Sequence, residues 1–464
     1  AEAVNVQSLP QGGMKRRPGF KYIDTINSES RLAAFAFNVE QTYLLVFTNN
    51  NIAVYKDDVK QADVTTTYTT TELFELQWTQ SADTMIIVHK DHQPAKLVRG
   101  ADHTIWTLSD IVLKNTPQHD YDGNATTLSA DLTDDAVIVT VDNTTGFPTA
   151  GNILVGNEVI SYTGTTGATF TGCVRGFNNS TAIAHDDEAE VTGVENVWSS
   201  TRGWTKTVTF YQGRMWFGGS KSRPQTLWGS KTNDFFNFDL GESLDDEGID
   251  ITLDTDMVNA ITAVYAGRHL QIFTTGGEFS INDIPITPAK SAVRRHTLFG
   301  SGSIPPKSID GATLYLDRTG KSVREFLFSY AEDAYTSGTV SLLASHLLNS
   351  PVDMDVLRGT DSAEANYVYF VNLDGSVAVF NTLRAQEVGG WTQWTTNGEV
   401  EGVAVVVEEV YFLVKRNVNG QVVRYLERLS KDSYTDSNIH KTQSSSATVT
   451  GLSHLDGEEC RVRA

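Results

Sequence analysis

The chain has 464 residues, of which 40% are hydrophobic and 10% aromatic, so it has ample material for a large core. Its 36 Lys and Arg against 57 Asp and Glu give a net charge of −21. This argues against a protein that grips nucleic acid, because such binding needs clustered cations to displace phosphate counterions. No run of about 18 apolar residues is present, which argues against a membrane span.

Short alternating strands with tight turns fill most of the sequence. Residues 42–55 place two apolar strands around Asn49–Asn51, and residues 83–99 repeat the pattern. Residues 206–239 predict three strands, joined by a Gln212–Gly213 turn and a Gly–Gly break. Further units follow at residues 259–283, 312–328, 366–394 and 402–429.

These seven units recur roughly every 35–55 residues once one insertion is set aside, which is a period typical of propeller blades. The sequence therefore predicts an all-β fold, a β-propeller of about six to seven blades. We expect a single short helix over residues 339–349, where leucines 342, 343, 347 and 348 follow a helical spacing and His346 is an ordinary polar residue.

The amino-acid composition changes in the middle and at the end of the chain. Residues 117–197 are rich in Thr, Gly and Asn and poor in aromatics, which predicts an inserted small all-β domain. Residues 1–116 then hold the N-terminal blades, and residues 198–430 the remaining ones. Residues 431–464 predict a polar connector and the start of a C-terminal β segment. This unpaired start suggests either that the native protein continues past Ala464 or that the segment pairs with another chain.

A short basic cluster, Lys15–Arg17, lies near the N-terminus, and the sequence has two cysteines. We expect Lys15–Arg17 to bond carbonyls or acidic groups where the chain enters the fold. Cys173 and Cys460 are too few for a disulfide framework and lack zinc spacing, so both are predicted to be free thiols of a protein assembled in the cytoplasm.

Two groups of residues suggest metal ions. His89 and His92 lie three apart, but that spacing suits a helix face, whereas here they straddle a strand end and a turn. Asp131, Asp134, Asp135 and residues 186–188 suggest calcium, but they form no DxDxDG-type loop. We therefore predict no metal site and no cofactor site.

Catalytic patterns are missing as well. The string at residues 300–303 lacks the strand–turn–helix setting of a nucleophile elbow, and no phosphate loop or HExxH motif occurs. Asp245, Asp246, Glu247 and Asp250 are dense enough to suggest glycoside hydrolysis, but a solvated acidic loop or acidic contacts to an Arg of a neighbouring subunit explain them better. We predict no catalytic residues and no enzyme.

Aromatic side chains offer either a sugar-stacking platform or a core. The core is the better interpretation, because blades pack sheet on sheet and need large side chains on both faces. The residues concerned are Trp204, Trp216, Trp228, Phe235, Phe236, Phe238, Trp391 and Trp394.

Several long strings resemble tail tubular protein B-type nozzle proteins of short-tailed bacteriophages. They are QGGMKRRPGFKYID, QSADTMIIVH, VTFYQGRMWFGGSKSRPQTLWGSKTNDFFNFD, GKSVREFLF, GGWTQWTTNGEVEGVAVV and NGQVVRYLERL. The resemblance covers most of residues 11–429 apart from the insertion, which resembles a small β module of phage structural proteins. Family members usually extend well beyond the GLSHLDGEE region at residues 451–459.

The resemblance implies a virion structural protein of the phage tail, assembled in the host cytoplasm. It implies a homohexameric ring at the distal end of the tail, attached to the tail adaptor ring and neighbouring fibres or spikes. DNA would pass through the lumen without sequence-specific binding, and a lining of negative charge suits that passage.

Two other functions remain open from the sequence. One is a host-surface glycan-binding or depolymerising tail protein, although no short β-helix repeats are visible. The other is a generic β-propeller scaffold for a protein partner, which predicts a monomer in solution.

Overall fold

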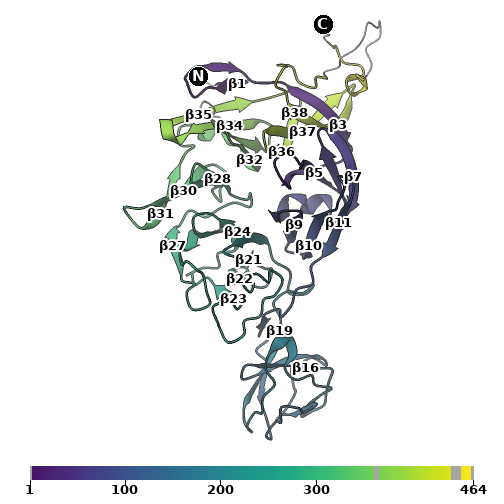
Figure 1. Cartoon of the computed structure of the whole chain (residues 1–464), viewed down its shortest axis with the longest axis vertical. Helices are drawn as coiled ribbons and strands as arrows, with labels where there is room; N and C mark the ends of the chain where they lie inside the picture. Colours follow the sequence, from purple (N-terminus) through teal and green to yellow (C-terminus); the bar gives the residue numbers. More distant parts are fainter. Residues whose placement is uncertain (1–2, 360–364, 440–450, 461–464) are drawn as a thin grey trace.

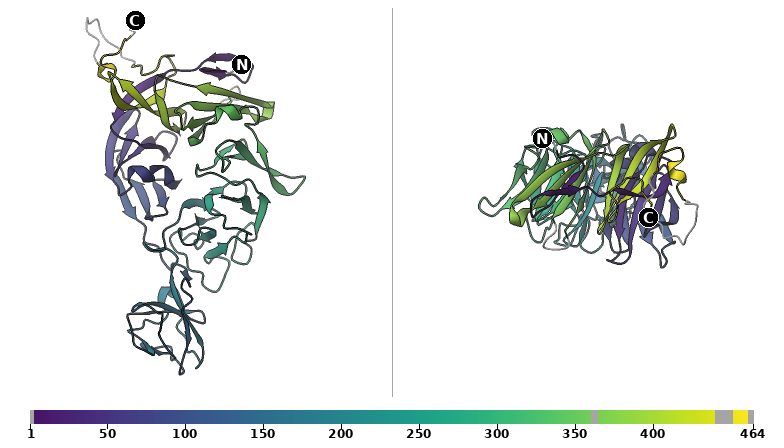
Figure 2. Two further views of the ribbon diagram at one scale, coloured as in Figure 1. Left: turned by 180° about the vertical axis from the view of Figure 1, so that it is seen from behind. Right: turned by 90° about the horizontal axis from the view of Figure 1, so that it is seen from above.

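The computed structural model describes residues 3–359, 365–439 and 451–460, and in this part of the chain the fold is a β-propeller with a small β domain projecting from its rim (Figure 1). Seven four-stranded antiparallel sheets are arranged in a ring. Seen from above, the sheets form a thick disc (Figure 2). The predicted fold class is confirmed, and the blade count among the described residues is seven.

Each blade is a simple meander from an inner to an outer strand. Blade 1 contains β4 (Arg31–Ala36), β5 (Thr42–Thr48), β6 (Asn51–Lys56) and β7 (Val59–Thr65), and blade 2 contains β8 (Gln77–Ser81), β9 (Thr84–His89), β10 (His92–Arg99) and β11 (Trp106–Asp110). Blade 3 contains β20 (Thr207–Tyr211), β21 (Arg214–Gly218), β22 (Thr226–Gly229) and β23 (Ile249–Thr252), and blade 4 contains β24 (Ile261–Ala266), β25 (Leu270–Thr274), β26 (Glu278–Ile281) and β27 (Val293–Thr297). Blade 5 contains β28 (Lys307–Ile309), β29 (Ala312–Leu316), β30 (Val323–Ser329) and β31 (Ala334–Thr339), and blade 6 contains β32 (Pro351–Leu357), β33 (Asn366–Asn372), β34 (Val377–Leu383) and β35 (Val388–Trp394).

The seventh blade closes the ring with strands from both ends of the chain. It contains β36 (Glu399–Val406), β37 (Glu409–Val418) and β38 (Gln421–Leu429), and its outer strand is β3 (Phe20–Ile26). Before β3, β1 (Val6–Ser8) and β2 (Met14–Arg16) form a hairpin, and β1 lies beside β35 of the sixth blade. Arg17 completes the closure, because its Nη1 and Nη2 donate to Asp436 Oδ1 and Oδ2 at 2.9 and 2.6 Å. The prediction that the basic cluster Lys15–Arg17 bonds carbonyls or acidic groups is therefore confirmed for Arg17.

Burial follows the position of a strand within its blade. All seven residues of β33 and all five of β21 are buried, because these strands have sheets packed against both faces. The outer strand β7 is mostly exposed. A hydrophobic cluster joins every pair of neighbouring blades, so the core is a ring of seven interfaces.

The predicted turns follow backbone geometry that few residues tolerate. Gln212 and Gly213 both have positive φ, at 49° and 71°, as a two-residue hairpin of the type I′ class requires. Asn50, between β5 and β6, also has positive φ (58°).

The inserted domain lies between β11 and β20, at the bottom of Figure 1. Its strands form a five-stranded and a three-stranded sheet around their own cluster. They are β12 (Gln118–His119), β13 (Ala125–Thr127), β14 (Ile138–Thr140), β15 (Gly151–Val155), β16 (Glu158–Tyr162), β17 (Gly164–Thr165), β18 (Thr169–Thr171) and β19 (Glu190–Asn196).

Helical structure among the described residues is limited to short 3-10 turns: η1 (Thr70–Glu75), η2 (Phe177–Asn179), η3 (Ser345–Leu347), η4 (Arg384–Gln386) and η5 (Ser453–Leu455). The helix predicted over residues 339–349 is therefore wrong in extent. Leu347 and Leu348 are buried, but Leu342 and Leu343 point to solvent, so the four leucines do not share one face.

The predicted start of a C-terminal β segment is not found among residues 451–460, the described part of this stretch. Residues 440–450 and 461–464 lie outside the described residues. Residues 451–460 contain η5 in place of a strand, and this turn packs on the closing blade, where His454 stacks on Tyr22 at 4.0 Å between ring centroids.

Candidate functional site

The inner strands surround a cavity of about 580 Å³ at the centre of the propeller. Its charged lining residues come from three blades: Arg31, Lys307, Asp353, Asp355 and Arg358. A volume of this size suits a small ligand and is far too small for a DNA duplex. A single subunit is therefore no conduit for DNA.

The charges in this cavity hold neighbouring blades together. Asp353 Oδ2 and Asp355 Oδ2 accept hydrogen bonds from the backbone N–H groups of Val403 and Val405 on β36, at 3.0 and 2.7 Å. Lys307 Nζ lies 2.7 Å from Asp355 Oδ1. Burial raises the pKa of Asp353, because the charged carboxylate loses water there. These contacts join blade 6 to blades 5 and 7, so the charges have a structural role.

Arg31 is another charged residue that lines the cavity, and it is almost fully buried. Its Nη1 donates to the carbonyls of Leu73 and Leu76 at 2.9 and 2.5 Å, and its guanidinium lies over the Trp78 ring at 4.5 Å. Burial lowers the pKa of Arg31. The guanidinium therefore joins blade 1 to the connection that leads into blade 2.

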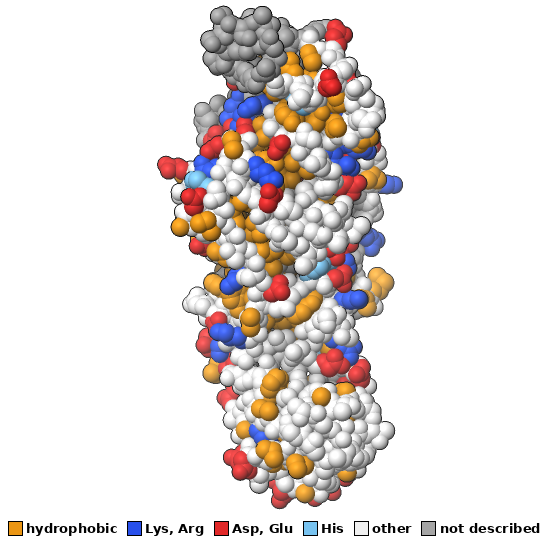
Figure 3. All heavy atoms as spheres, turned by 90° about the vertical axis from the view of Figure 1, so that its right-hand side faces the viewer, with side chains coloured by type: hydrophobic (Ala, Val, Ile, Leu, Met, Phe, Trp, Pro, Cys, Tyr) orange, Lys and Arg blue, Asp and Glu red, His pale blue; other side chains and the backbone are white. Residues whose placement is uncertain are grey.

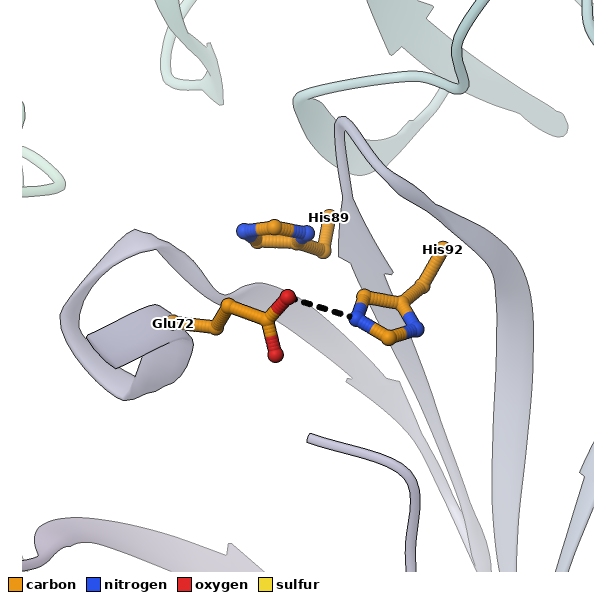
Figure 4. Close-up of side chains that lie close together, drawn as sticks. All are labelled: Glu72, His89 and His92. Carbon is orange, nitrogen blue, oxygen red and sulfur yellow. Dashed lines mark hydrogen bonds and ion pairs between the residues drawn. The ribbon is translucent and has the colours of Figure 1, made fainter. Parts of the chain in front are cut away.

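The two histidines singled out in the sequence do lie together, with a third potential ligand (Figure 4). His89 ends β9 and His92 begins β10, and Glu72 comes from η1. One ligand atom from each of the three lies within 4.8 Å of the others. Sequence reasoning missed Glu72, because it is 17 residues before His89 and belongs to the preceding connection.

The acidic loop is organised by arginines. Arg214 is buried and donates to the carbonyls of Glu247 and Asp245 at 2.5 and 2.6 Å. Asp250 Oδ2 accepts hydrogen bonds from Nη1 of Arg223 at 3.0 Å and from the indole N–H of Trp228 at 2.9 Å. Both partners belong to the same chain, so the contact to an Arg of a neighbouring subunit stays a prediction.

The aromatic candidates mostly form core, as predicted. Trp216, Trp228, Trp394 and Phe238 are at most 1% exposed, so they cannot stack on a sugar. Trp204, Phe236 and Trp391 are partly buried in the inter-blade clusters, whereas Phe235 is 36% exposed. Cys173 and Cys460 are free, as the sequence predicts.

Loops at the two ends of the strands differ in their exposed apolar side chains. Strand direction alternates within each meander, so connections between blades lie on one face, together with the turns between second and third strands. On this connecting face, three successive connections each expose an adjacent pair of large apolar residues. The pairs are Met257 and Val258, Leu298 and Phe299, and Leu342 and Leu343.

On the opposite face the large exposed apolar side chains occur singly in their loops, as Val39, Ile105, Ile284, Tyr330 and Val407 do. Isolated apolar residues are normal on any protein surface, whereas interaction sites are marked by larger, contiguous apolar patches. Along the rim of the propeller, acidic and basic side chains are scattered, while the insertion shows red with little blue (Figure 3).

No helix in the described part of the chain is long and apolar enough to cross a membrane. No protein-family model matches the sequence, and no curated protein matches it either. Solved structures with similar folds include the WD40 repeats of RRP9 (6% identity, 89% of this chain and 99% of that chain, TM-score 0.43). They also include the C-terminal WD40 domain of Sif2 (9%, 90% and 100%, 0.41) and Sqt1 from Chaetomium thermophilum (9%, 88% and 99%, 0.43). Such distant similarities carry no argument about function.

Proposed function

We propose that this chain is a structural subunit of a short phage tail, a nozzle protein whose copies form the distal ring through which DNA leaves the capsid. The strings that resemble tail tubular protein B-type proteins support this proposal. Among them, VTFYQGRMWFGG spans β20 and β21, GKSVREFLF spans β30, and NGQVVRYLERL spans β38. They are thus strands of four-stranded blades.

The observation that carries the proposal is the run of paired apolar side chains on the connecting face. Leu342 and Leu343 are 73% and 93% exposed, and Met257 and Val258 are both 71% exposed. Because the pairs lie on connections between consecutive blades 3 to 6, they form an arc. Burying such an arc against a neighbouring copy of the chain stabilises a ring.

A rigid subunit also suits a tube wall under load. Each blade is joined to the next by a hydrophobic cluster, and β3 closes the ring of blades by pairing with β38. The DNA passage would be the space enclosed by several copies, since the cavity within one subunit is small and crossed by charged side chains. A passage lined by negative charge would not bind DNA, and the net charge of −21 suits such a lining.

Sedimentation of the purified chain and two variants tests this proposal. We expect the wild type to form sixfold assemblies, and Leu342→Asp with Leu343→Asp to remain a folded monomer. Val39→Asp is the matched control, because Val39 is equally exposed (86%) but lies on the opposite face. It should assemble like the wild type.

A wild type that stays monomeric at every concentration, with a partner protein bound one to one, would favour the scaffold function instead. Release of reducing ends from host polysaccharide would establish a depolymerase. The burial of the candidate aromatics gives no support to that second alternative.

A further inference from the structure

The hairpin between β9 and β10 brings two histidines onto one face of its sheet. His89 and His92 are direct partners in the antiparallel register, on either side of the two-residue Lys90–Asp91 turn. Direct partners project to the same side with Cβ atoms about 5 Å apart. A spacing of three therefore gathers ligands across a tight hairpin as well as along a helix, and the two ring centroids are 5.2 Å apart.

Glu72 supplies a carboxylate from a neighbouring element whose orientation is fixed. Its Oε2 accepts the backbone N–H of Thr69 at 2.7 Å, closing a capping box at the start of η1. Its Oε1 lies 3.0 Å from Nε2 of His92. Ligands around a tetrahedral Zn²⁺ are separated by about 3.3 Å, given bond lengths near 2.0 Å, so this pair already has the spacing of two zinc ligands.

An independent observation comes from the buried ring of His89, which is 1% exposed. Its Nε2 atom is buried and has no hydrogen-bond partner within the described residues. Glu75 Oε2 lies 3.3 Å away, which is an ion pair only for a protonated ring. A neutral imidazole binds a metal through its unprotonated ring nitrogen, so Nε2 of His89 is the candidate ligand atom of this ring.

We propose that Glu72, His89 and His92 bind a Zn²⁺ ion. Imidazole and carboxylate are ligands that zinc prefers, and two histidines with one glutamate leave a fourth position for water. Glu72 and His92 side chains are 23% and 22% exposed, so the ion has an entry path. Among the described residues, this is the one group of three such side chains close enough to share an ion.

The surroundings provide outer-shell partners for both rings. Thr67 Oγ1 lies 3.4 Å from Nδ1 of His92, and the Glu75 carboxylate lies beside His89. Nδ1 of His89 accepts the Asp91 N–H at 3.2 Å, a long bond that a change of tautomer would release. The ion would tie η1 to the β9–β10 hairpin.

This position is at the base of the inserted domain. The segment that returns from the insertion is anchored on the same hairpin, because the backbone N–H of Trp204 donates to the Lys90 carbonyl at 2.7 Å. The zinc would therefore be structural, fixing the connection between blades 1 and 2 to the anchor of the insertion.

Calorimetric titration of the EDTA-treated full chain with ZnCl₂ tests the proposal. We expect one ion per chain, a higher melting temperature with zinc, and an affinity lowered at least about 100-fold in His92→Gln and in Glu72→Gln. Both residues are partly exposed, so these variants should fold, which circular dichroism verifies. Substituting Co²⁺ should give tetrahedral absorption bands that His92→Gln abolishes.

His346→Gln is the matched control, because His346 is exposed and lies far along the chain in η3. It should bind zinc like the wild type. Two results would overturn the site: no saturable binding by the wild type, or equal weakening in His346→Gln and His92→Gln, which would indicate adventitious binding by surface histidines.

Discussion

The propeller and the inserted domain are both built from short antiparallel strands, but they bury different side chains. The clusters between blades contain Trp216, Trp228 and Trp394, whereas the cluster of the insertion is mainly aliphatic, with Tyr162 and Phe170 as its large, fully buried rings. Sheets packed on both faces leave thick layers that large rings fill. The two small sheets of the insertion enclose less space.

Charge separates the two regions even more clearly. Residues 117–197 contain twelve Asp and Glu but a single basic residue, Arg175, so the insertion carries about half of the net charge. Arg175 is turned inward, where its Nε and Nη2 donate to the two oxygens of the buried Glu158 at 2.7 Å each. The charged side chains on the surface of the insertion are therefore almost all acidic, whereas the propeller pairs many of its charges.

The largest effect that separates the regions is expected from Trp216→Ala. Trp216 is fully buried between blades 3 and 4, so its removal should cost the propeller about 3–5 kcal/mol. Hydrogen exchange followed by mass spectrometry should show faster exchange in the blades and unchanged exchange in the insertion. Leu244→Ala, at a residue that is 59% exposed, should change stability by less than about 0.5 kcal/mol.

Acid should weaken the insertion through Glu158. Burial alone would raise the pKa of Glu158, but hydrogen bonds from Arg175, the Gly176 N–H and His185 lower it to about 2. Because the folded pKa lies below the ordinary value, the stabilisation is complete above that value and is lost as pH falls from about 4.5 to about 2. The loss amounts to about 3 kcal/mol.

Urea unfolding of the insertion, followed by hydrogen exchange across this pH range, measures that loss. Glu158→Gln should flatten the pH dependence of the insertion while leaving that of the propeller unchanged. An equally steep dependence in Glu158→Gln would assign the effect to other carboxylates.

A smaller and matched effect is expected from two buried tyrosines. Tyr162 donates to the Pro148 carbonyl at 3.0 Å in the insertion, and Tyr315 shares a 2.6 Å hydrogen bond with Ser337 in the propeller. Tyr162→Phe should destabilise the insertion by about 1 kcal/mol, and Tyr315→Phe should do the same to the propeller alone. If either variant loosened both regions equally, they would not be independent folding units.

The smallest effect is expected on DNA binding. The wild type should show no salt-dependent affinity for duplex DNA, since its surface releases few phosphate counterions. Replacing the exposed Asp134 and Asp186 by Lys should leave binding weak, because the remaining carboxylates still dominate the insertion. Strong binding by the wild type in an electrophoretic shift assay would show that the chain carries a basic surface incompatible with passive passage.

The sequence revealed the blades because their signals are local. Asn50, Gly213 and similar turn residues fall where the backbone needs positive φ, and alternating apolar residues lie between them. Closure of the ring was not predictable in this way, because β3 pairs with β38 across most of the chain and neither strand indicates its partner.

The candidate sites were harder to predict for the same reason. Glu72 lies near His89 and His92 only because η1 packs on the β9–β10 hairpin. A spacing of three residues was interpreted for a helix, but a two-residue turn also places two such residues side by side on one face of a hairpin. Likewise, Leu342 and Leu343 matched a helical stripe, yet the connection between β31 and β32 exposes them.

The copy number and position of this chain in intact short-tailed particles test the nozzle proposal most directly. Quantitative mass spectrometry of purified particles, with electron microscopy of the tail tip, should find six copies in a ring around the tail axis. A chain that is absent from the particles, or present there as a single propeller away from the axis, would contradict it.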